Sequence, residues 1–455
     1  MKKFHLLLTT ISLDVGIQNK IKKKKAMTQG FQTVKKARRA GTAVAKSAAA
    51  DRLSNVKLST EQANLKLKIM EFTRSHLKSF QKGDKPSMFV IQGDAGTGKS
   101  VVLNSLFNEI QKASTTSGDA LLGTSNYLVV NHPEMLKLYL NICKKFPYIS
   151  RNCLERPTSL INKLQKDRSI ADVVIVDEAH LLATSKDSFK RFYGQNHLQE
   201  LMGLAKVLII VYDEKQALRM GCFWDEESGN GANLQNFYDQ VPDGRKDWYR
   251  LKQQFRVAAP PDVLQWIEDI SVKGVIPKYP QKSEQFDFKI WDDCGAMFES
   301  LKEHDANLGQ CRMLATYDFP YRLDGKDYYV TCGDNFKVRW DRYTPKAVLP
   351  WSERSDTIDE VGSVYTIQGF DLKYAGVILG RSIGYDAKND CIMLKPEMYD
   401  DHAGFTKKKN IKDSAMVERK IIMNSLNVLL TRGVNGLYVY AWDPELRQRL
   451  AETRK

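Results

Sequence analysis

The sequence lacks any apolar run of the roughly 18 to 20 residues that a membrane-spanning helix needs. Runs such as Val207 to Val211 end after a few residues. Cysteine is scarce too: the seven cysteines are scattered over 455 residues and show neither a CxxC pair nor a Cys/His metal spacing. We therefore predict no membrane span, no disulfide framework and no zinc or iron–sulfur centre. Unpaired thiols favour a reducing, intracellular compartment, the cytoplasm or a nucleus.

Acidic residues are almost missing from the first 50 positions. That stretch holds 12 basic residues against one acid, Asp14, a net charge of +11, whereas the whole chain carries +15. We expect residues 1–57 to form a basic, flexible segment. It is either an arm that neutralises nucleic-acid phosphates or a solvated tail. A start at Met27 would remove the lysine run at positions 22–25.

A phosphate-binding motif follows the first predicted strand. Met88 to Gln92 is a short apolar run that leads into GDAGTGKS at 93–100 and a helical pattern from Val101 to Lys112. In this strand–loop–helix context, backbone N–H groups bind phosphates, the lysine reaches the β- and γ-phosphates, and the last hydroxyl binds magnesium. The pattern therefore predicts ATP and Mg²⁺ as cofactors. The predicted binding residues are Gly93, Ala95, Gly96, Thr97, Gly98, Lys99, Ser100 and Val101, with Ser100 also a magnesium ligand.

Two acids end a second predicted strand. Val173 to Val176 is a continuous apolar run, as in strands buried within parallel sheets, and Asp177 and Glu178 follow it. Ligands bind at this carboxyl end of such sheets. We predict that Asp177 holds the magnesium and that Glu178 polarises the attacking water as general base. His180 is either a packing or a capping residue.

Further segments complete an α/β pattern. Val207 to Tyr212 predicts a third strand, which ends in the polar segment Asp213 to Gln216, and Tyr127 to Val130 predicts a fourth. The amphipathic stretch from Pro133 to Lys145 predicts a crossover helix. Strands that alternate with helices in this way indicate a doubly wound lobe with a mainly parallel sheet.

The order of these elements resembles a superfamily 1 helicase-type motor, and more narrowly the Schlafen group 3-like DNA/RNA helicase domain family, over most of residues 58–455. The C-terminal half carries this resemblance in VYTIQGFD at 364–371 and in NVLLTRG at 427–433, followed by GLYVY at 436–440. The resemblance implies two RecA-like lobes, 58–245 and 246–455, with the boundary in the polar region Asp225 to Lys246. ATP would then be hydrolysed between lobes that move against each other.

The resemblance also implies roles for residues outside the phosphate loop. Gln62 would read the adenine edge, and Gln216 would sense the γ-phosphate beside the catalytic Lys99 and Glu178. Arg256 and Arg432 would act as arginine fingers supplied within one chain. The residues expected near the sugar are Gly369 and Asp371.

For nucleic acid, the resemblance implies a single-stranded track over both lobes, past residues 124–126 and His132 in the first lobe and Thr366 in the second. The aromatic residues Tyr127, Trp340 and Tyr365 could stack on bases, but each lies in or beside a predicted strand, and we favour core packing. Two strands at 328–332 and 336–340 predict a β-hairpin that either separates strands or decorates the lobe. The polar segment 400–413 predicts a mobile loop that either contacts phosphates or is only solvated.

The leading hypothesis is an ATP-dependent nucleic-acid motor, a helicase or translocase acting on DNA or RNA. The alternative is a nucleotide-switched regulatory or scaffold protein without motor activity. A nucleic-acid binder with a degenerate ATP site is a third hypothesis, which the intact Lys99, Asp177 and Glu178 oppose. We find no nuclease motif, so any cutting activity would come from a partner protein such as a nuclease.

Overall fold

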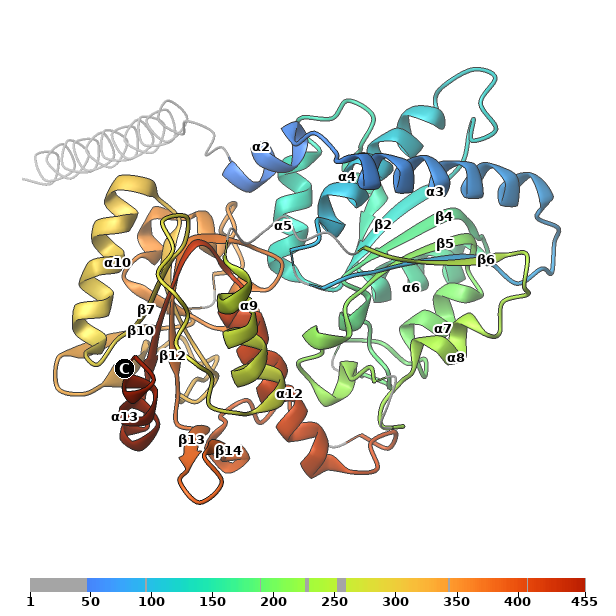
Figure 1. The fold of residues 1–455 in the computed structure, drawn as a ribbon. Helices are drawn as coiled ribbons and strands as arrows, with labels where there is room; N and C mark the ends of the chain where they lie inside the picture. The colour runs from blue at the N-terminus through green and yellow to red at the C-terminus, as the bar shows by residue number, and fades with distance from the viewer. Residues whose placement is uncertain are drawn as a thin grey trace, which may run out of the picture. The chain divides into compact units, whose positions relative to one another are not determined.

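Two mainly parallel β-sheets, each flanked by helices, carry the elements with the predicted site residues (Figure 1). This computed structural model describes residues 47–455 except 95, 189, 226–228, 252–258, 343, 407 and 455. The basic segment up to residue 46 therefore lies outside the described residues, and so do Ala95 and Arg256. Among the described residues, we find no helix that combines the length and the apolar character needed to span a bilayer.

The first sheet has six strands, all paired in parallel. The order of its strands is β3 (Leu154–Glu155), β2 (Asn126–Val130), β4 (Ala171–Asp177), β5 (Ala205–Tyr212), β1 (Ser87–Gln92) and β6 (Lys246–Arg250). The four strands predicted from apolar runs are confirmed as β1, β2, β4 and β5. Because these strands run in parallel, their carboxyl ends meet at one edge of the sheet.

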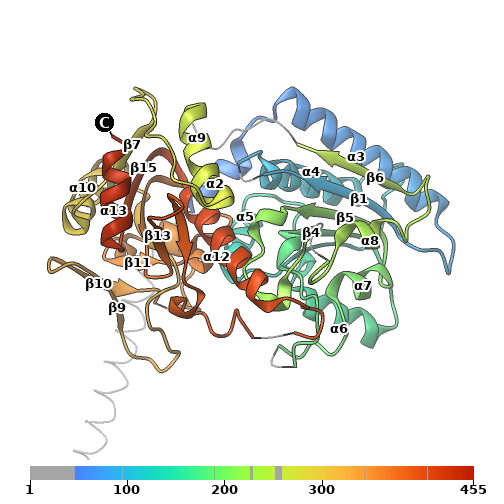
Figure 2. The same ribbon diagram turned by 60° about the horizontal axis from the view of Figure 1, so that its bottom comes forward.

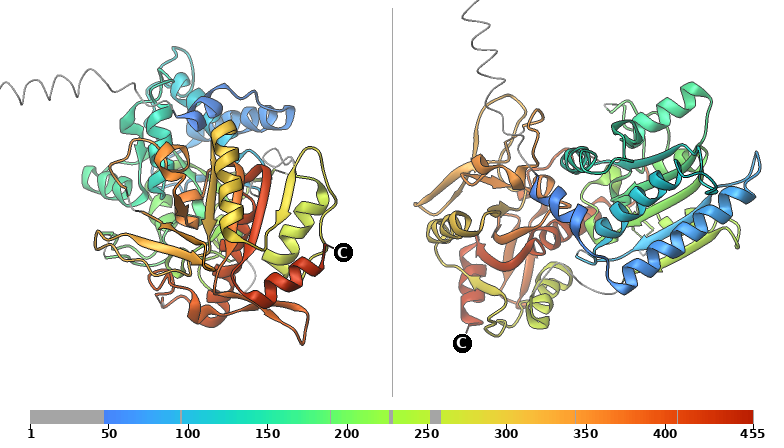
Figure 3. Two further views of the ribbon diagram at one scale, coloured as in Figure 1. Left: turned by 90° about the vertical axis from the view of Figure 1, so that its left-hand side faces the viewer. Right: turned by 90° about the horizontal axis from the view of Figure 1, so that it is seen from above.

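Helices cover both faces of this sheet (Figures 1 and 3). Alternate strand residues point to opposite faces, so Phe89 and Ile91 join one apolar core while Met88 and Val90 join another. The first core includes side chains of α3 (Thr60–Ser79), α4 (Lys99–Ala113) and α5 (Pro133–Ile142), and the second those of α6 (Pro157–Asp167) and α7 (His197–Met202).

Residues 48–55, which we had assigned to the flexible segment, form the helix α2 (Ala48–Asn55). Ala50 is fully buried, and the side-chain amide of Asn104 in α4 donates to the backbone carbonyl of Leu53 at 3.1 Å. Alanine has the highest helix propensity, which explains the helix at the end of this alanine-rich stretch.

The second sheet has seven strands, and only the β9–β10 pair is antiparallel. Helices α10 (Cys294–Leu308) and α13 (Pro444–Glu452) lie on one side of it, and α9 (Pro261–Glu268) and α12 (Ser414–Leu430) on the other (Figure 2). The predicted β-hairpin is confirmed, and it extends the edge of this sheet. The strand order is β7 (Asp287–Ile290), β15 (Gly433–Ala441), β12 (Leu372–Leu379), β8 (Cys311–Ala315), β11 (Glu360–Gly362), β10 (Phe336–Trp340) and β9 (Tyr328–Cys332).

The first sheet extends past the boundary that we predicted between residues 245 and 246. Strand β6 (Lys246–Arg250) pairs with β1, so the chain leaves the first sheet only after Arg250. In its described part, the polar region before it contains the short helix α8 (Leu234–Tyr238). Its polar composition therefore reflects an exposed part of the first lobe and does not mark where that lobe ends.

The segment 400–413, for which we predicted a mobile loop, packs against the first lobe in its described part. Ile411 joins an apolar cluster with Met220 and Phe223. The side-chain oxygen of Asn230 accepts hydrogen bonds from the backbone N–H of Lys412 at 2.8 Å and from that of Asp413 at 2.9 Å. The charge of this segment favoured a mobile loop. The buried apolar side chain of Ile411 shows instead that its described part packs against the first lobe.

Candidate functional site

The phosphate loop connects β1 to α4 at the carboxyl edge of the first sheet. Gly96 and Gly98 have φ angles of 89° and 78°, a backbone region that glycine enters without steric cost. A Cβ at Gly93 would lie 2.6 Å from Oγ1 of Thr97, so a larger residue would require the neighbouring side chain to move. Gly98 is the N-cap of α4, so the loop places the N-terminus of this helix, a position that favours anions, beside the cradle. This cradle fits the phosphates of a nucleotide.

Lys99 is buried at the start of α4 and makes three polar contacts. Its Nζ donates to the backbone carbonyls of Gly93 at 2.6 Å and Asp94 at 2.9 Å, and it lies 3.1 Å from Oδ2 of Asp213. Burial, the largest single effect, raises the pKa of Asp213, but the charge of Lys99 and the hydrogen bonds from Gln216 and Lys99 act against it, and the net effect on this pKa is a lowering. Asp213 follows β5, so two neighbouring strands contribute to one ion pair.

Asp177 lies at the end of β4 and is buried. Its Oδ2 accepts a hydrogen bond from the hydroxyl of Tyr139 at 2.6 Å, and its Oδ1 accepts one from the backbone N–H of Glu178 at 3.0 Å. Burial and the neighbouring Glu178 carboxylate raise the pKa of Asp177 above its ordinary value. A divalent cation would stabilise the ionised form of this buried carboxyl, so the position of Asp177 fits the magnesium ligand that we predicted.

Glu178 has a φ of 50°, in the left-handed region that residues other than glycine seldom adopt. Its Oε2 lies 3.0 Å from Nε2 of His180, which is fully buried in the short 3₁₀-helix η2 (Ala179–Leu181). This ring nitrogen lies 3.1 Å from Nε2 of Gln368, in the second lobe. His180 therefore has polar contacts in both lobes, which neither of our interpretations of this residue included.

Gln216 and Gln368 complete a continuous series of contacts. The amide nitrogen of Gln368 donates to the backbone carbonyl of Gln216 at 3.1 Å, and the side chain of Gln216 donates to Oδ2 of Asp213 at 2.6 Å. The series thus runs from Lys99 through Asp213, Gln216, Gln368 and His180 to Glu178. It joins the phosphate loop to the second acid by way of a residue of the second lobe.

The structure describes all of the residues predicted to lie around the base and the sugar of the nucleotide. Gln62 is buried in the first turn of α3, where its side-chain oxygen accepts from the backbone N–H of Ser59 at 3.0 Å in a capping box. Gly369 has a φ of 85°, and a Cβ there would lie 2.4 Å from Sδ of Met135 in α5. Asp371 is half-buried just before β12. Gly369 thus allows the second lobe to approach α5 closely.

Of the two predicted arginine fingers, the structure describes only Arg432. Its side chain is fully buried and donates hydrogen bonds to the backbone carbonyl of Val428 at 2.6 Å, to that of Phe370 at 3.3 Å and to the hydroxyl of Thr431 at 3.0 Å. These three hydrogen bonds hold the guanidinium within the second lobe.

The residues predicted for the nucleic-acid track differ in exposure. His132 is buried as the N-cap of α5, and this burial lowers its pKa to about 4. Trp340 is also buried, in agreement with core packing. Tyr127 and Tyr365 are half-buried, each beneath a cation: Nζ of Lys163 lies 4.9 Å from the first ring, and the guanidinium carbon of Arg219 lies 4.1 Å from the second. Of the other residues predicted along this track, Ser125 is exposed, Thr124 and Thr366 are half-buried, and Asn126 is buried.

Three residues of this site were not predicted from the sequence. Asp213 follows a predicted strand and Gln368 lies within the VYTIQGFD segment, so the position of each in the sequence could have indicated that it belongs to the site. Nothing in the sequence indicated that Tyr139 belongs to the site, because it is one of several apolar residues in an amphipathic helix. Its contact with Asp177 depends on how α5 packs against β4.

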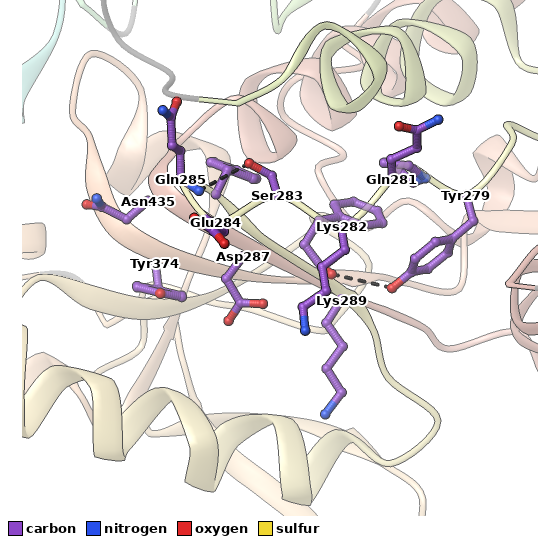
Figure 4. A pocket seen from close by; sticks show the side chains of 13 residues that line it. Tyr279, Gln281, Lys282, Ser283, Glu284, Gln285, Asp287, Lys289, Tyr374 and Asn435 are labelled. Atoms are coloured by element: carbon purple, nitrogen blue, oxygen red, sulfur yellow. Dashed lines mark hydrogen bonds between the residues drawn. The ribbon is translucent and has the colours of Figure 1, made fainter.

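A separate cavity of about 680 Å³ lies along β7, the edge strand of the second sheet (Figure 4). Residues 279–289 line it together with Tyr374 and Asn435. Its lining includes none of the residues of the phosphate loop or of the acidic strand end. The candidate site is therefore assigned from the motifs and their contacts, and this cavity is not part of it.

The phosphate loop, the acidic strand end and the paired parallel sheets define a helicase-like P-loop protein. The chain belongs to the family described as Schlafen group 3, DNA/RNA helicase domain, which matches residues 86–443. An uncharacterized protein of Saccharomyces cerevisiae, YPL245W, is 67% identical over 447 residues, which cover 95% of this chain and 98% of that protein.

Two solved structures are similar to this chain at low sequence identity. The Pif1 helicase from Candida albicans is 10% identical, with 87% of this chain and 97% of that chain covered and a TM-score of 0.34. A DEAD box protein from Methanococcus jannaschii is also 10% identical, with 88% and 95% covered and a TM-score of 0.31.

Proposed function

We propose that this protein is an ATP-dependent motor that acts on DNA or RNA, as a helicase or translocase. The observation that carries the proposal is the contact series from Lys99 to Glu178, because it passes through Gln368 of the second lobe. A site that responds to lobe position can link hydrolysis to movement of one lobe against the other. The family, whose description names a DNA/RNA helicase domain, supports nucleic acid as the partner.

Different residues of this chain would bind the phosphates, accept a proton, hold the magnesium and stabilise the transition state. Backbone N–H groups of the loop 93–100 and Nζ of Lys99 would bind the phosphates, and Glu178 would accept the proton of the attacking water. Ser100 and Asp177 would hold the magnesium, which, when bound, shields the phosphate charge. Gln216 would sense the γ-phosphate, and Arg256 and Arg432 would spread the charge of the transition state.

The nucleic acid would follow a single-stranded track past His132 and Thr366. A nuclease or another protein partner would supply any cutting. The seven cysteines form no disulfide with one another, which agrees with a reducing compartment, and we place the activity in the cytoplasm or the nucleus.

The test is the ATPase rate of the purified full chain with and without single- and double-stranded DNA and RNA. We expect at least one of these nucleic acids to raise the rate. Glu178→Gln should lower the rate by about 10²- to 10⁴-fold while ATP still binds, because an amide cannot act as the base. Equal rates with and without every nucleic acid would contradict the motor and favour the nucleotide-switched alternative. Equal hydrolysis by the wild type and Glu178→Gln would remove Glu178 from the mechanism.

A further inference from the structure

Tyr139 and Asp177 form a buried hydrogen bond between two elements of the first lobe. Tyr139 lies in the second half of α5, and Asp177 is the last residue of β4. Both side chains are buried, and the hydroxyl of Tyr139 donates to Oδ2 of Asp177 at 2.6 Å. This distance lies in the range of a hydroxyl that donates to a carboxylate. A tyrosine has a single O–H group, so its one donor is used for this carboxylate.

A second donor holds the other oxygen of the carboxylate. The backbone N–H of Glu178 donates to Oδ1 of Asp177 at 3.0 Å. Two donors from different elements therefore fix the plane of this group, because neither oxygen can turn away without losing a bond. A carboxylate has about four lone pairs, so each oxygen keeps one that can bind a cation. Hydrogen bonds of this kind orient the side chains that hold metal ions.

Helix α5 also contacts the second lobe. Oε2 of Glu134 accepts a hydrogen bond from the backbone N–H of Trp351 at 3.0 Å, and the amide of Asn141 donates to the backbone carbonyl of Val348 at 3.3 Å. Glu134 and Asn141 are seven residues apart, about two helical turns, so they lie on the same side of the helix. The helix that carries Tyr139 is therefore held to the second lobe at two successive places along its length.

We propose that Tyr139 is a positioning residue that holds the carboxylate of Asp177 for magnesium, and that α5 makes this hold depend on the second lobe. A shift of α5 with the second lobe would lengthen the bond from Tyr139 and allow the carboxylate to turn. The site would then bind magnesium more weakly. The inference rests on the proposed function, because magnesium at Asp177 belongs to the ATP site, and it adds a way in which lobe movement changes that site.

The test uses Tyr139→Phe, which removes the hydroxyl and keeps the ring. The matched control is Tyr438→Phe, because the hydroxyl of Tyr438, in β15 of the second lobe, donates to Oδ2 of Asp287 at 2.5 Å. The Kd of the purified full chain for a fluorescent, non-hydrolysable ATP analogue is measured in EDTA and in saturating magnesium. By linkage, the ratio of these two Kd values reports how tightly the protein–nucleotide complex binds the metal.

We expect Tyr139→Phe to lower this ratio at least about tenfold while the Kd in EDTA stays within about twofold of the wild type. Tyr438→Phe should change neither value. The wild-type ratio in Tyr139→Phe, or an equal fall of the ratio in Tyr438→Phe, would overturn the role of Tyr139 and leave its hydroxyl as a structural contact. Tyr139→Met, which also lacks a donor, repeats the comparison if Tyr139→Phe fails to fold.

The dependence on the second lobe is tested with Glu134→Leu, which removes the acceptor for the N–H of Trp351. We expect this substitution to lower the ratio about threefold when Tyr139 is intact and less than about 1.5-fold in the Tyr139→Phe background. Equal falls in both backgrounds, or no fall in either, would overturn this part of the inference. Both comparisons measure binding and not turnover. They therefore decide the inference even if no nucleic acid raises the ATPase rate and the proposed function fails.

Discussion

Lys99 is part of a buried ion pair as well as of the phosphate loop. Its partner Asp213 is 2% exposed and accepts hydrogen bonds from both Lys99 and Gln216. Breaking a buried pair by removing one partner leaves an uncompensated charge in a low-dielectric environment. A substitution at Lys99 should therefore affect stability as well as nucleotide binding.

We predict that Lys99→Ala lowers the free energy of unfolding by about 3–5 kcal/mol at pH 7. Adding Asp213→Asn should restore part of this loss, because the asparagine carries no charge that needs a cation. Both variants should fail to bind ATP, since neither has the ammonium group that reaches the phosphates. Urea unfolding measures the first effect and titration with a fluorescent ATP analogue the second. Unchanged stability of Lys99→Ala would contradict the proposed importance of the pair.

At the scale of residues, the phosphate loop could be predicted because its glycines, lysine and serine are close together at a fixed spacing. Asp177 and Glu178 could be predicted from their place after an apolar run. Tyr139 could not, because its contact joins a helix to a strand far apart in the sequence. The arginine-finger role of Arg432 stays a prediction, and Arg256 lies outside the described residues.

The acidic strand end continues into a segment that helix α7 anchors. Nδ1 of His197, in the first turn of this helix, accepts a hydrogen bond from the backbone N–H of Ala183 at 2.9 Å, and its Nε2 lies 3.0 Å from the hydroxyl of Thr158. Burial of this ring lowers its pKa to about 3. The folded protein therefore keeps His197 neutral where an unfolded chain would protonate it.

We predict that this histidine makes the protein less stable in mild acid. The unfolded state takes up a proton below an ordinary histidine pKa of about 6.5, so stability is lost as the pH falls from there toward 3. Between pH 7 and pH 5 the loss from this residue should be about 2 kcal/mol. Urea unfolding of the wild type and of His197→Gln at both pH values measures it. The same pH dependence in both proteins would show that His197 does not titrate as described.

At the scale of elements, the strands β1, β2, β4 and β5 could be predicted because strands buried on both faces are continuous apolar runs. Strand β6, with the sequence KDWYR, has no such run, since it lies at the edge of the sheet and none of its residues is fully buried. The helix α2 was not predicted, because the basic charge that precedes it led us to assign the whole of residues 1–57 to a flexible segment. Burial at an edge or beneath a helix depends on the fold and is not visible in local composition.

At the scale of the whole molecule, the excess positive charge is concentrated before residue 47. Residues 1–46 hold all 12 of the basic residues counted in the N-terminal stretch, and the remainder of the chain carries a net charge of only +4. If this segment is an arm for nucleic acid, its contribution to binding is electrostatic and falls as salt rises.

We predict that removing residues 1–46 weakens the binding of single-stranded nucleic acid, and more at 50 mM than at 200 mM salt. The plot of log affinity against log salt concentration should become shallower by several units, because each phosphate contact contributes about 0.7 for a single strand. Fluorescence anisotropy of a labelled oligonucleotide measures the slope, and unchanged ATP affinity serves as the control for folding. An unchanged slope would identify the segment as a solvated tail.

The pairing of two lobes was inferred from a resemblance and not from apolar patterns. Apart from β12 and β15, the strands of the second sheet have five residues or fewer, and polar residues interrupt several of them, for example DFKI in β7 and CRMLA in β8. The sequence shows neither the order of these strands nor the contact of Gln368 with the first lobe. Whether the lobes act together depends on this contact. The test is therefore whether the bound nucleotide changes the affinity for nucleic acid.

The most direct measurement is the affinity of the Glu178→Gln variant for a single-stranded oligonucleotide with ATP and magnesium, with ADP and magnesium, and without nucleotide. A motor has to hold nucleic acid differently in different nucleotide states, and linkage requires the reciprocal effect on nucleotide affinity. We predict that the Kd differs by at least about fivefold between the ATP and ADP states. The same Kd in all three states, with nucleotide shown to be bound, would contradict the motor.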